Sequence, residues 1–205
     1  MKKLYLHHRE NYIKTLGPGE RYVIWVQGCV HNCKGCIAPE THSLNENGYW
    51  IEIDNILREI NQSKNLRGIT ISGGEPFLQA EALIYLLKKL KNKNLDIICY
   101  TGFLYEEILK GKVPFGKELL NYIDILIDGK YIEDLNKENY LRGSENQRII
   151  HLKNTYKKNE EQILKLKNRN IEIKIIDETT FFIAGIPPKK MEKDWEKIRE
   201  KIYKK

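Results

Sequence analysis

Tyr22-Val-Ile-Trp-Val26-Gln-Gly-Cys29-Val-His-Asn-Cys33-Lys-Gly-Cys36 is the most constraining stretch of this 205-residue chain. Its first five residues are apolar, which predicts a buried strand, and the three cysteines follow in the loop beyond it. Three thiolates on one short loop match three corners of an iron–sulfur cluster and leave the fourth metal position open. A structural zinc site requires a fourth ligand, and within this loop only His31 offers one. The cysteine pattern therefore favours a cluster and keeps zinc as the alternative.

The bulk composition is that of an ordinary globular protein. Apolar residues make up 41% and charged residues 31% of the sequence, and no run approaches the ~18 apolar residues of a membrane helix. The N-terminus lacks the apolar stretch of a signal peptide, and clustered free cysteines are typical of a reducing compartment. We therefore expect a cytoplasmic protein without a membrane partner. Cys99, Trp25 and Trp50 are expected in the apolar core.

The net charge of +7 raises the question of nucleic-acid binding. The lysines are spread along predicted helix faces, and in the 189–205 stretch they alternate with glutamates, as on a solvated surface. Neither a zinc-finger spacing nor an aromatic–basic RNA signature accompanies the charge. We expect no nucleic-acid partner, and the positive charge suits an acidic protein partner or the phosphates of a reductant.

Short apolar runs alternate with helical stripes along the chain. The predicted strands are 22–26, 68–72, 95–100, 124–127 and 148–152, and the predicted helices carry the apolar stripes 53–60, 82–90, 119–123 and 160–167. This alternation indicates parallel strands joined by crossover helices, in an open sheet or a β/α barrel. Residues 171–176 and 179–184 predict a further hairpin, and a basic amphipathic helix with Met191, Trp195 and Ile198 follows.

Three unusual sequences follow predicted strands, at the ends where ligands gather in α/β proteins. They are the cysteine loop, Ser72-Gly-Gly-Glu-Pro76 and Asp128-Gly-Lys130. Two glycines present bare backbone to a small polar ligand, and the glutamate after them offers a carboxylate to an ammonium group. Taken singly, each of the last two sequences also fits an ordinary turn.

Together, Cys-x3-Cys-x2-Cys and the later Gly-Gly-Glu-Pro resemble the radical S-adenosylmethionine (SAM) enzymes. Three further segments are similar to the activases of anaerobic ribonucleotide reductase, a group of glycyl-radical enzyme activases. These segments are Tyr100-Thr-Gly-Phe103, Asp128-Gly-Lys-Tyr-Ile-Glu-Asp-Leu135 and Leu141-Arg-Gly-Ser-Glu-Asn-Gln-Arg148. The resemblance covers about residues 15–153.

The resemblance implies a single radical SAM domain over residues 1–205, with a partial β/α barrel at about 15–153 and a C-terminal strand and helix extension at about 154–205. It implies a [4Fe–4S] cluster bound through Cys29, Cys33 and Cys36, with SAM on the fourth iron. Reductive cleavage of SAM then releases methionine and a 5′-deoxyadenosyl radical, which removes a hydrogen atom from a glycine of the reductase. A flavodoxin or ferredoxin is the implied electron donor, under anaerobic conditions. No side chain is assigned a catalytic role.

The resemblance also implies which residues contact SAM. The expected contacts are Gly73, Gly74 and Glu75 at the methionyl amino group; Asp128 and Lys130 at the amino acid zwitterion; Ser144 and Asn146 at ribose or carboxylate; and the backbone of Gly35 and Ile37 at adenine. Gly35 stands where many radical SAM enzymes have an aromatic residue. The neighbouring Arg142 and Arg148 are expected to brace their loop by pairing with carboxylates.

Two alternatives stay open at the level of sequence. One is a radical SAM enzyme that acts on another glycyl-radical enzyme or on a small molecule, such as a 7-deazapurine cyclase, whose substrate needs a pocket closed by the protein's own residues. The other is a non-catalytic metal-binding module. Metal analysis separates the second alternative from an enzyme, because iron with matching sulfide indicates the cluster and zinc as the sole metal indicates the module.

Overall fold

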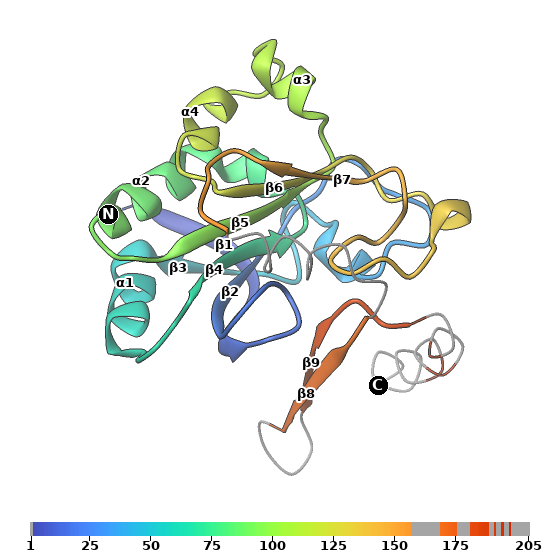
Figure 1. Ribbon diagram of the computed structural model, residues 1–205, viewed down its shortest axis with the longest axis horizontal. Helices are drawn as coiled ribbons and strands as arrows, with labels where there is room; N and C mark the ends of the chain where they lie inside the picture. Colours follow the sequence, from blue (N-terminus) through green and yellow to red (C-terminus); the bar gives the residue numbers. More distant parts are fainter. Residues whose placement is uncertain are drawn as a thin grey trace.

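The computed structural model describes residues 2–156, 169–175 and 181–188, together with Met191, Asp194 and Lys197. Within these residues the chain forms a seven-stranded sheet with the strand order β3-β1-β2-β4-β5-β6-β7 and a separate two-stranded sheet, β8-β9 (Figure 1). The predicted helix at 160–167 lies outside the described residues, as does most of the predicted C-terminal helix.

The strands of the large sheet are β1 (Lys3–Ile13), β2 (Arg21–Val26), β3 (Tyr49–Glu52), β4 (Gly68–Gly73), β5 (Asp96–Thr101), β6 (Ile125–Asp128) and β7 (Arg148–His151), and those of the small sheet are β8 (Ile171–Ile175) and β9 (Phe181–Gly185). Strands β2, β4, β5 and β6 are parallel, whereas β1, β3 and β7 run antiparallel to their neighbours. All seven predicted strands are confirmed to within two residues at each end. The sequence does not predict β1 or β3.

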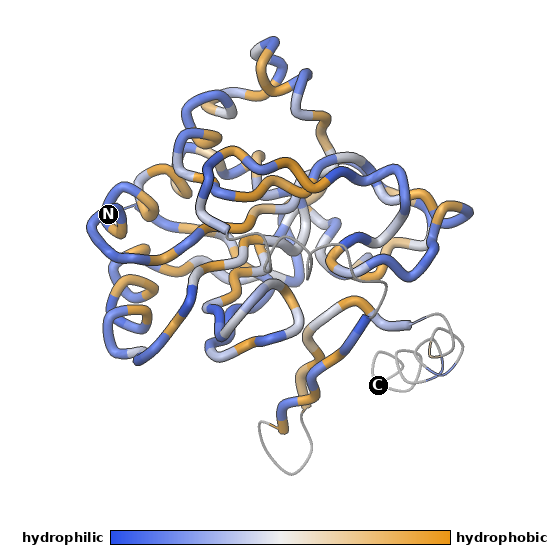
Figure 2. The backbone as a smooth tube through the Cα atoms, viewed as in Figure 1, coloured by the Kyte–Doolittle hydropathy of each residue, from blue (hydrophilic) through white to orange (hydrophobic). Residues whose placement is uncertain are grey.

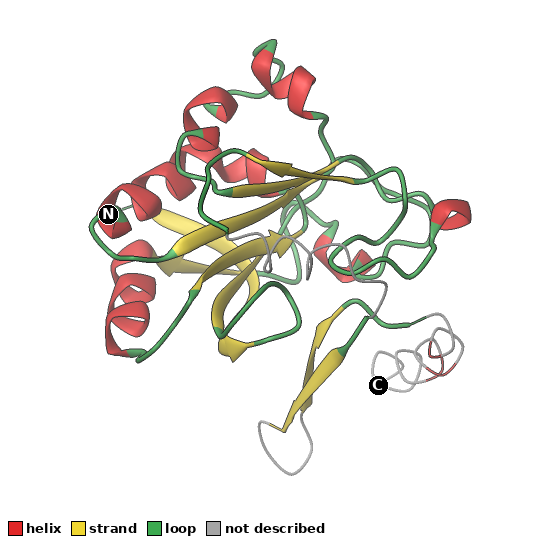
Figure 3. Ribbon diagram, in the orientation of Figure 1, coloured by secondary structure: helices red, strands yellow, loops and turns green. Residues whose placement is uncertain are grey.

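The helices are α1 (Ile53–Gln62), α2 (Ala80–Leu90), α3 (Tyr105–Leu109) and α4 (Gly116–Leu120), and short 3-10 turns are η1 (Pro39–Thr41), η2 (Pro76–Gln79) and η3 (Glu133–Leu135). The four α-helices lie in the connections between successive parallel strands, as the alternating pattern predicts (Figure 3). The helix predicted to reach residue 123 ends at Leu120, and Ile123 is fully buried in the turn that follows.

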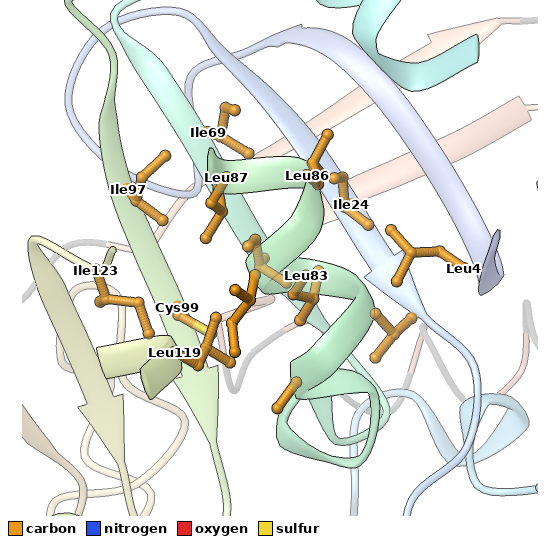
Figure 4. Close-up of a cluster of buried hydrophobic side chains, with 14 of the residues drawn as sticks. Leu4, Ile24, Ile69, Leu83, Leu86, Leu87, Ile97, Cys99, Leu119 and Ile123 are labelled. Atoms are coloured by element: carbon orange, nitrogen blue, oxygen red, sulfur yellow. The ribbon is translucent and has the colours of Figure 1, made fainter. Parts of the chain in front are cut away.

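The main core lies between the sheet and α2. Leu83, Leu86 and Leu87 are at most 3% exposed and pack over the apolar side chains of β2, β4 and β5 (Figure 4). Burying a leucine contributes about 1.5–3 kcal/mol relative to leaving it exposed, so this stripe fixes α2 on the sheet. Cys99 is fully buried in the same core, which confirms its predicted place.

The hairpin β8-β9 packs on β1 and β2, away from the helices (Figure 1). Ala184 joins a second core with Val23, and the ring of Phe182 meets that of Trp25 edge-on at 4.9 Å. Figure 2 shows apolar residues in both hairpin strands and along the central strands of the large sheet. The expectation that Trp50 is a core residue is wrong: it is 65% exposed, because β3 is an edge strand.

In the described part of the chain the large sheet is open, with β3 and β7 at its edges, so the strands do not close into a barrel. Mixed α/β architecture with a parallel centre is therefore the observed fold. Over the same residues, none of the helices has the length and apolar character needed to cross a bilayer.

Candidate functional site

A cavity of about 590 Å³ lies at the carboxyl ends of the parallel strands. The loops that follow β2, β4 and β6 all contribute to its wall, including Cys29, Cys33, Cys36, Gly73, Gly74, Gly129 and Lys130. The volume falls within the range of roughly 300–1,000 Å³ that is usual for small-molecule sites. The three sequences that follow predicted strands therefore meet at one place, as expected from the topology.

The cysteine loop is folded tightly between two anchored ends. At its start, the Gly28 N–H donates to Thr41 O at 2.9 Å and the Cys29 N–H donates to His42 O at 3.1 Å. Inside the loop, the backbone is left-handed at Asn32, with a φ of 45°, and at Gly35, with a φ of 69°. These two bends turn the chain twice between the first and the third cysteine.

The thiols sit in a partly buried environment. Burial raises the pKa of the Cys36 thiol to about 11 and also raises the pKa of the Cys29 thiol. Backbone hydrogen bonds from His31 and Asn32 oppose the shift at Cys29. Burial therefore favours the protonated form of both thiols in the metal-free chain, and metal binding must displace these protons.

The three cysteines fit a cluster better than a single ion. Among the described residues, no three His, Cys, Asp or Glu side chains converge closely enough to share one metal ion. One zinc ion with Zn–S bonds of ~2.3 Å would hold its sulfurs within about 4 Å of each other. A four-iron cube spreads its ligands more widely, because each binds a different iron. His31, the zinc alternative's fourth ligand, is already engaged: its Nε2 lies 2.7 Å from Glu75 Oε2.

Gly73 and Gly74 bring the end of β4 against β2. A Cβ on Gly73 would lie 2.4 Å from the backbone N and O of Val26, and a Cβ on Gly74 would lie 2.2 Å from Gly28 O. The Gly74 N–H donates to Val26 O at 2.8 Å, which holds the two backbones together. Strand packing alone therefore requires both glycines, which also line the cavity.

Glu75 is fully buried and lies outside the cavity wall. Its Oε1 accepts from the Phe77 N–H at 3.0 Å and from the Thr101 hydroxyl at 2.8 Å. Its Oε2 accepts from the Gly102 N–H at 2.8 Å and lies next to the imidazole of His31. The carboxylate that the sequence assigns to the methionyl amino group thus has four partners within the protein.

Asp128 is also fully buried and away from the cavity wall. It accepts from the Tyr105 N–H at 2.7 Å and from Arg148 Nε at 2.9 Å, and it forms an ion pair with the same guanidinium. Arg148 also binds Glu106 at 3.0 and 2.8 Å, so it pairs with carboxylates as expected. Arg142 instead donates to backbone carbonyls, and Lys130 is exposed at the cavity.

The loop that contains Arg-Gly-Ser-Glu-Asn-Gln is joined to the loop after β6 by side-chain bonds. Asn146 Nδ2 donates to Lys130 O at 2.8 Å, and Ser144 Oγ accepts from the Ile132 N–H at 3.1 Å. Gln147 accepts from the Gly143 N–H at 2.7 Å and donates to Gly129 O at 2.9 Å. The sequence gives Gln147 no role although it is part of the quoted motif, and the structure places it on the cavity wall.

The predicted SAM contacts thus divide into two groups. Those that line the cavity are Gly35, Ile37, Gly73, Gly74 and Lys130, and those that do not are Glu75, Asp128, Ser144 and Asn146. The cavity wall also includes residues that the sequence does not single out, from the hairpin and from the residues just before and after it, such as Arg169, Phe182 and Ile186. Nothing in the local sequence marks them, since they reach the site through long-range packing.

Comparison with known proteins places these features in context. Residues 15–150 match the family model of a 4Fe-4S single cluster domain. The anaerobic ribonucleoside-triphosphate reductase-activating protein of Vibrio cholerae is 36% identical over 143 residues, which cover 66% of this chain and 89% of that protein. The protein of the same name from Enterobacteria phage T4 is 35% identical over 140 residues, or 65% of this chain and 85% of its own length.

Two further likenesses are less complete. The pyruvate formate-lyase-activating enzyme of Staphylococcus aureus is 32% identical over 156 residues, which cover 73% of this chain and 62% of that enzyme. The crystal structure of QueE from Escherichia coli aligns with a TM-score of 0.44 and 19% identity, over 50% of this chain and 54% of that one.

Proposed function

This chain belongs to the family of anaerobic ribonucleoside-triphosphate reductase-activating proteins, which are radical SAM enzymes, and we propose that it generates the glycyl radical of an anaerobic ribonucleotide reductase. Family membership confirms the predicted cofactors, a [4Fe–4S] cluster and SAM, and answers the alternative of a non-catalytic module. One observation carries the proposal to this chain: three cysteines, which among the described residues do not converge on a single-ion site, share one cavity with the Gly73–Gly74 backbone.

We assign Cys29, Cys33 and Cys36 as the ligands of three irons. When bound, the cluster supplies the electron that breaks a carbon–sulfur bond of SAM. The protein positions SAM and limits the access of water. The backbone of Gly73 and Gly74 is available to the methionyl group, and the Lys130 ammonium offers a positive charge to a carboxylate at the same wall. The backbone of Gly35 and Ile37 is proposed to face adenine.

Glu75, Asp128, Ser144 and Asn146 are proposed to act through their neighbours in place of the direct SAM contacts that the sequence predicts. Each of them has polar atoms engaged with backbone or side-chain groups of the surrounding loops, and only the Oδ1 of Asn146 is buried without a hydrogen-bond partner among the described residues. Removing any of them would shift a wall of the cavity, because each joins two different loops. In this proposal, these hydrogen bonds maintain the shape of the cavity, and SAM binds to the cavity in that shape.

For the fold, we propose that β2, β4, β5 and β6 with their crossover helices form one wall of a partial β/α barrel. Residues 1–205 are proposed to be a single domain, with the core at about 15–153 and the extension at about 154–205. Two observations support this proposal. The hairpin shares a buried cluster with β1 and β2, and it contributes to the wall of the same cavity as the cysteines.

For partners, we propose a flavodoxin or ferredoxin as the electron donor. The net charge of +7 and the exposed Lys34, in the middle of the cysteine loop, suit an acidic electron carrier. A cytoplasmic location is proposed because the three cysteines must stay reduced until iron binds. Nucleic acid is not proposed as a partner.

The test is anaerobic mixing of the iron-loaded protein with SAM, a reductant and its cognate anaerobic reductase. We expect an electron paramagnetic resonance (EPR) signal of a glycyl radical that requires SAM. A parallel sample contains pyruvate formate-lyase, and we expect less signal there, because the chain spans 89% of the Vibrio relative and only 62% of the Staphylococcus relative. A signal with the lyase alone, or SAM cleavage without a radical on either partner, overturns the proposed substrate.

A further inference from the structure

The middle of the cysteine loop has little backbone support. Within the described chain, residues 30–36 take part in one backbone–backbone hydrogen bond, from the Cys36 N–H to Cys33 O at 3.2 Å. Both ends are anchored, but the segment between them carries the second and third cysteines and the exposed Lys34. Some other contact must fix this segment if its sulfurs are to meet three corners of a rigid cluster.

The imidazole of His31 is the side chain best placed to do so. His31 lies two residues after the first cysteine and two before the second, yet its side chain is only 6% exposed. Its Nε2 lies 2.7 Å from Glu75 Oε2, and its ring meets the ring of Phe103 edge-on at 4.6 Å. The loop therefore inserts a side chain into the body of the protein at its midpoint.

Gly102 makes room for this ring. A Cβ at Gly102 would lie 2.2 Å from His31 Cδ2 and 2.5 Å from Nε2, closer than any real carbon atom can approach. The Gly102 N–H donates to Glu75 Oε2 at 2.8 Å, the same oxygen that meets the imidazole. Gly102, which follows β5 directly, thus binds the Glu75 carboxylate through its N–H and leaves space for the imidazole beside it.

Glu75 cannot turn away from the ring. Its other oxygen accepts from the Phe77 N–H and the Thr101 hydroxyl, at 3.0 and 2.8 Å. A fully buried carboxylate held at four points has no alternative rotamer that keeps those bonds. The acceptor for His31 is therefore preorganised by the ends of β4 and β5, which are rigid elements of the sheet.

We propose that Glu75, Gly102 and Phe103, here called the His31 socket, receive the imidazole of His31 and thereby set the position of the three-cysteine loop. His31 is a positioning residue in this account: it orients the ligands and touches no substrate. The inference deepens the proposed function and rests on it, because it supplies the geometry that the cluster requires. It also gives Tyr100-Thr-Gly-Phe103 a physical role, as the wall of the socket.

The first test uses the metal-free chain. Amide hydrogen exchange at Cys29 and Cys36, whose N–H groups donate to His42 O and Cys33 O, should become at least about tenfold faster in His31→Ala, because the contact of the imidazole with the buried Glu75 carboxyl group is lost along with the ring packing. His31→Gln, which keeps an N–H donor, should exchange more slowly than His31→Ala, and His31→Phe, which keeps only the bulk, should not recover. His151→Ala, at an exposed histidine of β7, is the matched control and should exchange like the parent protein.

A reciprocal change separates the socket from a general loss of folding. Gly102→Ala keeps the histidine but fills its space, so it should speed exchange over the same residues. The double variant should exchange no faster than His31→Ala, because both changes break one contact. Additive effects of the two changes, exchange at the parent rate in His31→Ala, or full recovery in His31→Phe each overturn the proposal. If His31→Ala does not fold, Gly102→Ala and His31→Gln carry the same comparison.

The second test uses the iron-loaded protein. After anaerobic reconstitution, His31→Ala and Gly102→Ala should bind less iron per chain, and the reduced cluster should lose the EPR change that SAM produces in the parent protein. His31→Gln should restore part of both. Parent-like iron content and EPR change in His31→Ala overturn the role of the socket. A parent protein that holds iron but shows no response to SAM contradicts the proposed function instead, and the hydrogen-exchange result remains independent of it.

Discussion

The two ends of the same parallel strands are built differently. At the amino ends, Arg21 Nη2 lies 2.6 Å from Asp96 Oδ1, and neither side chain is more than 2% exposed. Asp96 also accepts from Arg67 and from the Tyr156 hydroxyl, at 2.7 and 2.8 Å. At the carboxyl ends, three thiols, two glycines and an exposed lysine surround a cavity of about 590 Å³.

The difference lies in what the polar groups do for one another. At the amino ends, donors and acceptors are matched inside a packed interior, so they hold strands together and offer nothing to a ligand. At the carboxyl ends, the side chains of Glu75 and Asp128 bind neighbouring loops, and the groups that line the cavity include the three thiols, the glycine backbone and the Lys130 side chain. The amino ends of the strands thus contribute mainly to folding stability, and the carboxyl ends carry the candidate site. Substitutions at the amino ends should lower the free energy of unfolding, whereas substitutions at the carboxyl ends should lower cluster binding and SAM cleavage.

The largest expected effect is at the carboxyl end. Cys33→Ala should abolish the reduced-cluster EPR signal and lower 5′-deoxyadenosine formation by at least about 100-fold. Residues that only hydrogen-bond to a metal ligand typically change metal affinity or activity about 10- to 100-fold when they are replaced, and the loss of a ligand itself should have a larger effect. Its urea midpoint without metal should match that of the parent protein, since the residue lies on the loop and not in the core.

Cys99→Ala is the matched control, because it removes the same group from the buried face of β5. It should keep its iron content and cost about 1 kcal/mol of folding free energy, as expected for one lost buried atom. Loss of iron in Cys99→Ala, or SAM cleavage in Cys33→Ala, contradicts the division between the two kinds of cysteine.

The next effect is at the amino end and runs the other way. Asp96→Ala leaves Arg21 buried without its charge partner, which should lower the free energy of unfolding by about 3–5 kcal/mol. Urea denaturation of the metal-free chain measures this loss. Iron content of the folded fraction should be unchanged, because the ion pair lies at the opposite end of the strands. Arg67→Ala, at a side chain 38% exposed, should cost much less. Equal losses in the two variants would show that burial does not set the strength of these pairs.

The sequence predicts the parts of this comparison that depend on local pattern. Alternating apolar runs place the four parallel strands and the stripe of α2, and the topology then brings the loops after β2, β4 and β6 together. The strand β1 is missed because its Lys3–Ile13 sequence mixes charged and apolar residues, and its pairing depends on strands far along the chain.

What the sequence cannot supply is the partner of each polar group. Glu75 and Asp128 each carry a carboxylate that could bind the ammonium group of a zwitterionic ligand. Only the folded chain shows that these carboxylates accept hydrogen bonds from Thr101 and Arg148. The need for Gly102 is likewise invisible locally, because the ring that fills its space comes from His31, 71 positions earlier in the chain. Motifs therefore locate the site, and long-range contacts decide which residues touch a ligand.

The smallest expected effect concerns the exposed ion pair between Arg148 and Glu106 at the carboxyl end. It is compared with the buried pair between Arg21 and Asp96 at the amino end. The Arg148 guanidinium lowers the pKa of the exposed Glu106 carboxyl from its ordinary 4.5 to about 2. Because the folded-state pKa lies below the unfolded value, the pairing favours the folded chain above pH 4.5, and this contribution is lost as the pH falls through about 2. The same guanidinium holds the buried Asp128.

Carboxyl NMR titration should give a Glu106 pKa of about 2 at low ionic strength. In roughly 1 M salt, where the screening length falls to about 3 Å, the pKa of Glu106 should rise toward its ordinary value. The difference in urea midpoint between the parent protein and Asp96→Ala should persist in the same salt, because the Arg21–Asp96 pair is buried. Glu107, paired with Lys112 on the same surface, should respond to salt in the same direction as Glu106. A Glu106 pKa that ignores salt would mean that this exposed pair behaves like the buried one, and the contrast between the two ends would then rest on the thiols and the cavity alone.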